Sequence, residues 1–229
     1  MRAWAASVEE VFREASARWT LLAYFALSSL FILIFALAVN LDIVLARHFL
    51  AARHAGLYAV GSLVEKVAFW GPAFIVVVVF PQLVDASRRR VALARALRVM
   101  LVLSVAMVLV LGFVARPFVR AVFGPQYQGV GGVLWAFAAT GAIFSVIQLL
   151  VFSSLASGRR AMTRVLVLAA GIETGLIVAV FHRTITQLIS VVAIIGSAAL
   201  VAGLLIELRG GPPTAAVPAG ERGLGAGGD

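Results

Sequence analysis

Four charged residues interrupt stretches of the sequence that are otherwise apolar. Glu65 and Lys66 stand side by side within one such stretch, Glu173 lies near the middle of a second, and Asp42 closes a third. A charged side chain inside lipid is costly unless it faces a wet cavity, a bound ion or a group of opposite charge. Lysine at such a place could bind an anionic substrate, and the carboxylates could bind a proton or a sodium ion.

Lys66 is the first candidate for contact with a substrate. It lies about nine residues into its span, which places it ~13 Å from the outer end of the helix. The alternatives are a local ion pair with Glu65 and a side chain that snorkels to the interface. Neighbouring residues on a helix do not face each other, which favours a Lys66 that faces a cavity.

Glu173 and Glu65 are the candidates for ion binding, which would couple the chain to an ion gradient if it is a transporter. A carboxylate within a membrane span can bind a proton or Na⁺. For Glu173 the alternative is a protonated glutamic acid that is hydrogen-bonded between helices and has a structural role.

Asp42, Arg47 and Arg53 are further candidates for substrate binding, at the end of the first span and in the loop after it. The two arginines could attract an anion to the outer mouth of a transport path. The alternative is an ordinary solvated loop, in which Asp42 caps the span or pairs with Arg47. Pro72 and Pro81 can kink a helix and are candidates for gating, with a fixed bend as the alternative.

Composition defines the class of protein. Of the 229 residues, 62% are hydrophobic and 13% are charged, and the mean hydropathy is +1.06. A soluble domain would be about half apolar. The sequence therefore predicts an all-α, polytopic membrane protein. The net charge of +9 is explained by arginine-rich loops, and no nucleic-acid partner is expected.

The sequence offers no chemistry for an enzyme. It has no nucleotide-binding loop, no nucleophile elbow and no paired carboxylates at catalytic spacing. His48, His54 and His182 are scattered without metal-ligand spacing, and cysteine is absent. We expect no enzymatic activity, no cofactor and no metal.

Six apolar stretches are long enough to cross a bilayer, which takes about 20 helical residues. They are residues 19–39, 57–84, 97–115, 133–156, 165–181 and 185–206. The preceding residues 1–18 have apolar side chains at helical spacing, which predicts an amphipathic helix lying on the membrane surface. Residues 207–229 are rich in Gly, Pro and Ala, which predicts a disordered tail.

The distribution of basic residues predicts the orientation in the membrane. With Lys66 set aside as intramembrane, thirteen arginines fall at the end that carries both termini and five at the opposite end. Because basic residues are enriched on the cytoplasmic side, we expect both termini in the cytoplasm.

Short motifs in the first half of the sequence resemble those of a known exporter superfamily. In order along the chain they are Asn-x-Asp (Asn40, Asp42), Gly-x-Tyr (Gly56, Tyr58), Phe-Pro (Phe80, Pro81) and Phe-Gly-x-x-Tyr (Phe123, Gly124, Tyr127). Their order and spacing are similar to those of polysaccharide flippases of the O-antigen exporter type. These flippases share a superfamily with the multidrug-and-toxin (MATE) extruders.

The resemblance implies a fold and a function. The six spans resemble the C-terminal six-helix lobe of a MATE-like exporter, whose full length holds two such lobes. A lipid-linked oligosaccharide or polysaccharide precursor would cross the bacterial cytoplasmic membrane, and a second lobe or a second copy of the chain would be the partner. The alternatives are a drug extruder of the same superfamily and a non-transporting scaffold subunit of cell-envelope assembly.

Deletion of residues 210–229 should leave membrane insertion and thermal stability unchanged. A segment of this composition buries too little surface to offset the entropy lost on ordering it. Thermal unfolding of the full and truncated chains in detergent checks this expectation. A large loss of stability in the truncated chain would mean that the tail docks on the bundle.

Overall fold

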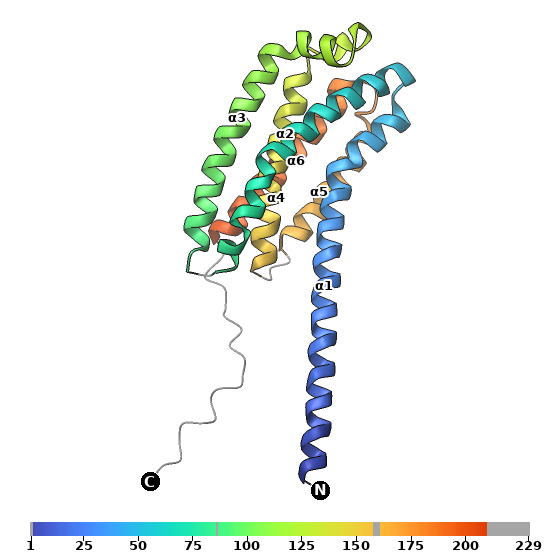
Figure 1. Ribbon diagram of the computed structural model, residues 1–229. Coiled ribbons are helices and arrows are strands. Elements are labelled where there is room, and N and C mark those ends of the chain that lie inside the picture. Colours follow the sequence, from blue (N-terminus) through green and yellow to red (C-terminus); the bar gives the residue numbers. More distant parts are fainter. Residues whose placement is uncertain (1, 86, 158–160, 210–229) are drawn as a thin grey trace.

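The computed structural model describes residues 2–85, 87–157 and 161–209, and the side chains of only some residues before Ile32. All regular structure in this part of the chain is helical (Figure 1). The helices are α1 (Arg2–Phe49), α2 (Ala52–Val84), α3 (Arg89–Val122), the 3₁₀ helix η1 (Pro125–Val130), α4 (Leu134–Ala156), α5 (Ala161–Ala179) and α6 (Ile185–Arg209).

Six of these helices are long and apolar enough to cross a membrane. Large apolar side chains lie exposed along their outer faces, with Phe113 at 87% and Val77 at 72%. Lipid tails would cover such faces at no cost, whereas water would not. The prediction of an all-helical chain with six helices of membrane-spanning character is therefore confirmed for the described residues.

Helices α1, α2, α3 and α6 extend beyond the predicted spans, α4 matches its span to within one residue, and α5 begins four residues earlier and ends two residues earlier than predicted. One uninterrupted helix, α1, begins at Arg2, covers the rest of the predicted surface segment and the predicted first span 19–39, and continues to Phe49. Hydropathy locates the part of a helix that suits lipid, whereas helix ends are set by backbone bonding and caps. Arg47 and His48 lie in the last turn of α1, where positive charge favours the helix.

Several predictions concern residues that the structure describes only in part or not at all. The side chains of residues 2–18 are not described, so their place on a membrane surface stays a prediction. The predicted disorder of residues 210–229 lies outside the described residues. The predicted tail began at residue 207, but α6 continues to Arg209.

Helix α4 is the centre of the bundle and packs most closely against α2. Two glycines permit this approach. The ring of Phe137 fills the place that a side chain would take at Gly61, and the backbone carbonyl of Glu65 does the same at Gly141. Small residues at helix contacts allow close packing where no water drives association. Helices α3 and α6 pack on other sides of α4.

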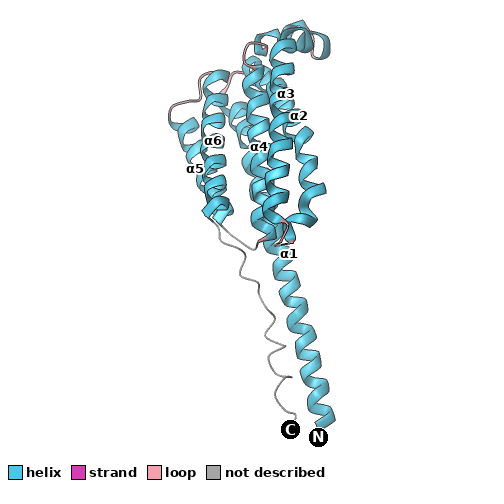
Figure 2. Cartoon of the chain, turned by 90° about the vertical axis from the view of Figure 1, so that its left-hand side faces the viewer, coloured by secondary structure: helices cyan, strands magenta, loops and turns pink. Residues whose placement is uncertain are grey.

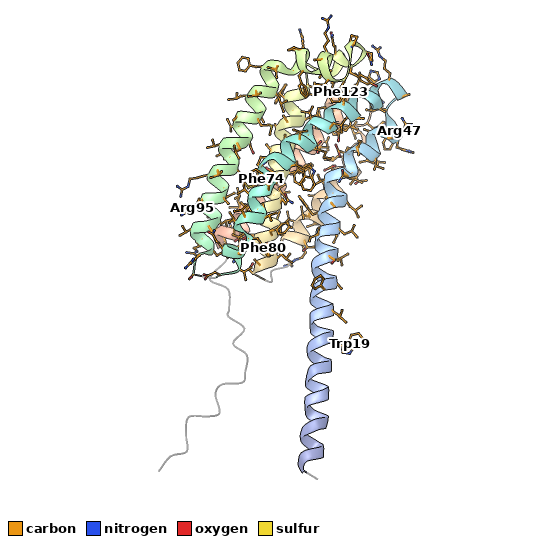
Figure 3. All side chains as sticks on the ribbon, viewed as in Figure 1. Trp19, Arg47, Phe74, Phe80, Arg95 and Phe123 are labelled. Carbon is orange, nitrogen blue, oxygen red and sulfur yellow. The ribbon has the colours of Figure 1, made fainter. Side chains whose placement is uncertain are left out.

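The N-terminal part of α1 projects past the other helices (Figures 1 and 2). A helix of 48 residues is about 72 Å long, more than twice the ~30 Å hydrocarbon core of a bilayer. Only the C-terminal part of α1 lies against the bundle, mainly along α5 and α2. Trp19 lies on the projecting part and is 72% exposed (Figure 3).

The bundle has two ends, named inner and outer here after the predicted orientation. The inner end carries the α2–α3 and α4–α5 turns and the end of α6. The outer end carries the α1–α2 turn, η1 and the α5–α6 turn. Phe80 and Arg95 lie near the inner end, and Arg47 and Phe123 near the outer end (Figure 3).

Single cysteines at Ser87, Ser157 and Gln126 test which end faces the cytoplasm. A membrane-impermeant maleimide added to intact cells should label Gln126→Cys at the outer end and spare Ser87→Cys and Ser157→Cys, because arginine is enriched at the inner end. The chain has no cysteine of its own, so unmodified chain gives the background. Labelling of Ser87→Cys without labelling of Gln126→Cys would reverse the orientation.

Candidate functional site

A buried hydrogen bond joins α1 to α2 in the interior of the bundle. The hydroxyl of Tyr58 donates to Oδ2 of Asp42 at 2.8 Å, and both residues are buried. The two helices form a hairpin whose turn lies around Leu50, eight residues from each partner. The sequence analysis placed Asp42 at a solvated span end or beside Arg47. Within the described structure it lies in the interior, bonded to tyrosine.

Lys66 is held by two oxygen atoms. Its ammonium donates to the backbone carbonyl of Val39 on α1 at 2.6 Å and to Oε1 of Glu65 at 2.9 Å. Glu65 is fully buried, whereas the Lys66 side chain is 22% exposed. The pairing with Glu65, which the sequence analysis had kept as the alternative, is present. Adjacent side chains on a helix point in different directions, but the flexible lysine stem lets the ammonium bend back to the carboxylate of Glu65.

Glu173 lies on α5 and is only 4% exposed. Its Oε1 has no hydrogen-bond partner among the described residues. The side chain lines a cavity of about 20 Å³ that also contacts Val39 on α1 and Phe144 on α4. A cavity needs about 10–15 Å³ to hold one water molecule, so one water or a small ion fits beside this carboxyl.

Three carboxyl groups share this region with one ammonium. Lys66 is bonded to Glu65 and to the carbonyl of Val39, and Val39 lines the same cavity as Glu173. Asp42 lies within electrostatic reach of Lys66 and of both glutamates. Oδ1 of Asp42 and Oε2 of Glu65 are also buried without a described partner. Three unneutralised negative charges beside one positive charge would be very costly in a dry interior. Protons or a bound cation must therefore supply the missing positive charge.

The cluster reaches the surface of the bundle between α1 and α2. Asn40 is exposed there and donates to the carbonyl of Ala36 on its own helix at 2.7 Å. The partly exposed Lys66 is bonded to the carbonyl of Val39, the residue that precedes Asn40 in α1. The α2 surface next to Lys66 is large and apolar, with Trp70 at 65% exposure. A polar spot thus interrupts an apolar outer face.

The other predicted site residues lie apart from this cluster. Arg47 and Arg53 are exposed at the outer end. Pro72 and Pro81 lie inside α2, which continues as one helix through both, with Pro72 buried and Pro81 exposed. Their part in gating stays a prediction.

A second charged cluster, which the sequence analysis missed, joins three helices at the inner end. Nη2 of Arg89 on α3 donates to both carboxylate oxygens of Glu207 on α6, at 2.9 and 2.7 Å, and to Oγ of Ser153 on α4 at 3.0 Å. The side chains of Arg89 and Glu207 are only 8% and 9% exposed. Arg89 had been counted only as a topology signal, and Glu207 had been assigned to the tail.

The neighbouring ion pair of Asp85 and Arg88 differs from the buried pair of Arg89 and Glu207, because it is exposed. Their charged groups are 3.5 Å apart with side chains 45% and 77% exposed. Hydrogen bonds from the side chain and backbone of Ser87 hold the pKa of Asp85 below its usual value. This pair is solvated and local, whereas Arg89 and Glu207 tie separate helices together.

Comparison with protein-family models, with curated proteins and with solved structures found no match to this chain.

Replacement of Glu207 by alanine should lower the free energy of unfolding by about 3 kcal/mol, because it leaves the buried Arg89 guanidinium without its partner. Thermal or denaturant unfolding in detergent measures the loss. The double variant Arg89→Met/Glu207→Met should recover most of it, since both charges are removed together.

Arg88→Met is the matched control for this prediction. It breaks the exposed pair with Asp85 and should change stability by no more than about 0.5 kcal/mol. Equal losses in Glu207→Ala and Arg88→Met would contradict the assigned role of the buried pair.

Proposed function

We propose that this chain is one lobe of a bacterial inner-membrane transporter that moves a lipid-linked oligosaccharide or polysaccharide precursor. The observation that supports this function best is the polar cluster of Asp42, Glu65, Lys66 and Glu173. It lies inside a bundle of membrane-spanning character and reaches the bundle surface beside Asn40.

An exposed polar spot on a membrane-facing surface needs cover. An amide and an ammonium that face lipid tails are costly, so the face between α1 and α2 is better suited to a wet cavity. Transporters built from related halves hold their substrate sites between those halves. A second six-helix lobe or a second copy of the chain would enclose such a cavity against this face.

The charged residues of the cluster would have separate roles in transport. Lys66, at the edge of the cluster, would contact the anionic phosphate that links sugar to lipid. Glu65 and Glu173, deeper in the bundle, would bind the proton or Na⁺ that drives the transport cycle. Lys66 bonded to Glu65 would then connect the two events, because neutralising Glu65 frees the ammonium for the substrate.

One observation favours a second candidate function. Both oxygen partners of Lys66 come from this chain itself, so the ammonium is satisfied without any substrate. A non-transporting scaffold subunit of cell-envelope assembly would need no more than this.

Export by charge variants separates these functions. In a strain lacking its own polysaccharide exporter, the chain is expressed with a complementary six-helix lobe and surface polysaccharide is measured. Lys66→Met should lower export by on the order of tenfold or more, the loss of one charge-assisted contact. Glu173→Gln should abolish export if ion binding drives the cycle. Lys66→Arg, which retains the charge, is the control and should keep measurable export.

Folding is followed separately by size-exclusion chromatography. If Lys66→Met fails to fold, the double variant Glu65→Gln/Lys66→Met removes both charges and is compared with Glu65→Gln alone, so that the difference in export between the two reports on Lys66. Export at the unmodified level in a well-folded variant without Lys66 would remove its substrate role and favour the scaffold. The chain expressed alone as a monomer should export nothing.

A further inference from the structure

Five exposed arginines gather at the outer end of the bundle. They come from the end of α1, the start of α2, the end of α3 and the α5–α6 turn. These residues, called here the arginine rim, are Arg47, Arg53, Arg116, Arg120 and Arg183. They are the same five that the topology count assigned to the side opposite the termini.

The arginine rim has no acidic residue to pair with in its own segments. The sequence contains no Asp or Glu between Glu65 and Asp85, between Asp85 and Glu173, or between Glu173 and Glu207. Asp42, Glu65 and Glu173 are buried, and Asp85 and Glu207 lie at the inner end. The ion pairs found among the described residues accordingly involve Lys66, Arg88 and Arg89. Among the described residues, no acidic side chain compensates the positive charge of the rim.

The position of Arg53 makes the excess of positive charge at the rim still less favourable. It lies in the first turn of α2, where the helix dipole is positive and acidic residues are preferred. The helix has no acidic residue in this turn and no side-chain cap at Ala51. An anion from outside the chain would relieve this repulsion.

An exposed tryptophan places the rim near the level of the lipid headgroups. Trp135 on α4 is 56% exposed. Trp135 packs beside Gly112, one helical turn from Arg116 on the same face of α3. Aromatic side chains anchor helices at the membrane–water boundary, so the arginines just beyond them meet the headgroups.

We propose that the arginine rim binds the phosphate groups of anionic lipids in the leaflet at the outer end. The planar guanidinium donates paired hydrogen bonds that match phosphate oxygens. Arginines spread over several helix ends match a ring of surrounding headgroups. This inference does not depend on transport, and it assigns the rim to lipid, not to the substrate.

Quenching of Trp135 fluorescence by brominated lipid tests the proposal. The chain with Trp4, Trp19 and Trp70 changed to Phe keeps Trp135 alone beside the rim. It is reconstituted into bilayers of phosphatidylcholine and phosphatidylglycerol, with one lipid or the other brominated. Phosphatidylglycerol should be enriched at Trp135 by on the order of fivefold, the effect of about one arginine–headgroup interaction. Raising the salt from about 0.05 to about 0.5 M should reduce the enrichment.

Two arginine-to-glutamine variants with equal loss of charge locate the effect. Changing the five rim residues should bring the enrichment close to one. The matched control changes five exposed arginines of the inner end and should leave the enrichment at Trp135 unaltered. These control residues are Arg88, Arg90, Arg95, Arg98 and Arg164. Arg89 is kept because it is buried and paired with Glu207.

Three results would contradict the proposal. Equal quenching by the two lipids in the unmodified rim, or an enrichment that survives loss of the rim, would show that the rim does not select anionic lipid. Loss of enrichment on adding inorganic phosphate, beyond that caused by chloride at the same ionic strength, would identify soluble phosphate as the ligand instead. Because the readout is lipid contact, failure here leaves the proposed transport function untouched.

Discussion

The scarcity of water inside a bilayer governs this structure, because polar groups in the spans must find partners within the protein. Lys66 shows the consequence most directly. Its ammonium takes a backbone carbonyl of α1 and a carboxylate of α2, and so joins two helices at a place where neither could tolerate a free charge. Tyr58 and Asp42 join the same helices by a second bond. The close glycine contacts of α2 with α4 involve Gly61 and the backbone of Glu65, next to the same polar residues.

The fold was predictable at the level of helix number and order, because that level depends only on hydropathy over about 20 residues. Helix ends were not. The sequence analysis placed a loop from Asn40 onward, although α1 continues through Arg47 to Phe49. Charged residues at the end of a span leave the lipid but keep helical backbone bonds, so a change of hydropathy does not mark the end of a helix.

The candidate site was predictable in its charged members but not in its partners. Glu65, Lys66 and Glu173 stand out because charge is rare in apolar stretches. Tyr58 does not, since a tyrosine in such a stretch is ordinary, and only the hairpin register around Leu50 could have paired it with Asp42. Arg89 and Glu207 are 118 residues apart, and their pairing depends on how α3 and α6 pack around α4. Neither hydropathy nor local spacing contains that information.

The unbroken length of α1 has a mechanical consequence. From Arg2 to Phe49 the helix contains neither proline nor glycine, so it lacks the residues at which helices commonly bend. Such a helix would act as a stiff lever pivoting near Val39, whose carbonyl Lys66 holds. A tilt of about 10° at that point would displace the N-terminal end, roughly 55 Å away, by about 10 Å. A force applied to the projecting arm would thus reach the buried carboxyl groups as a small rotation, without any hinge to absorb it.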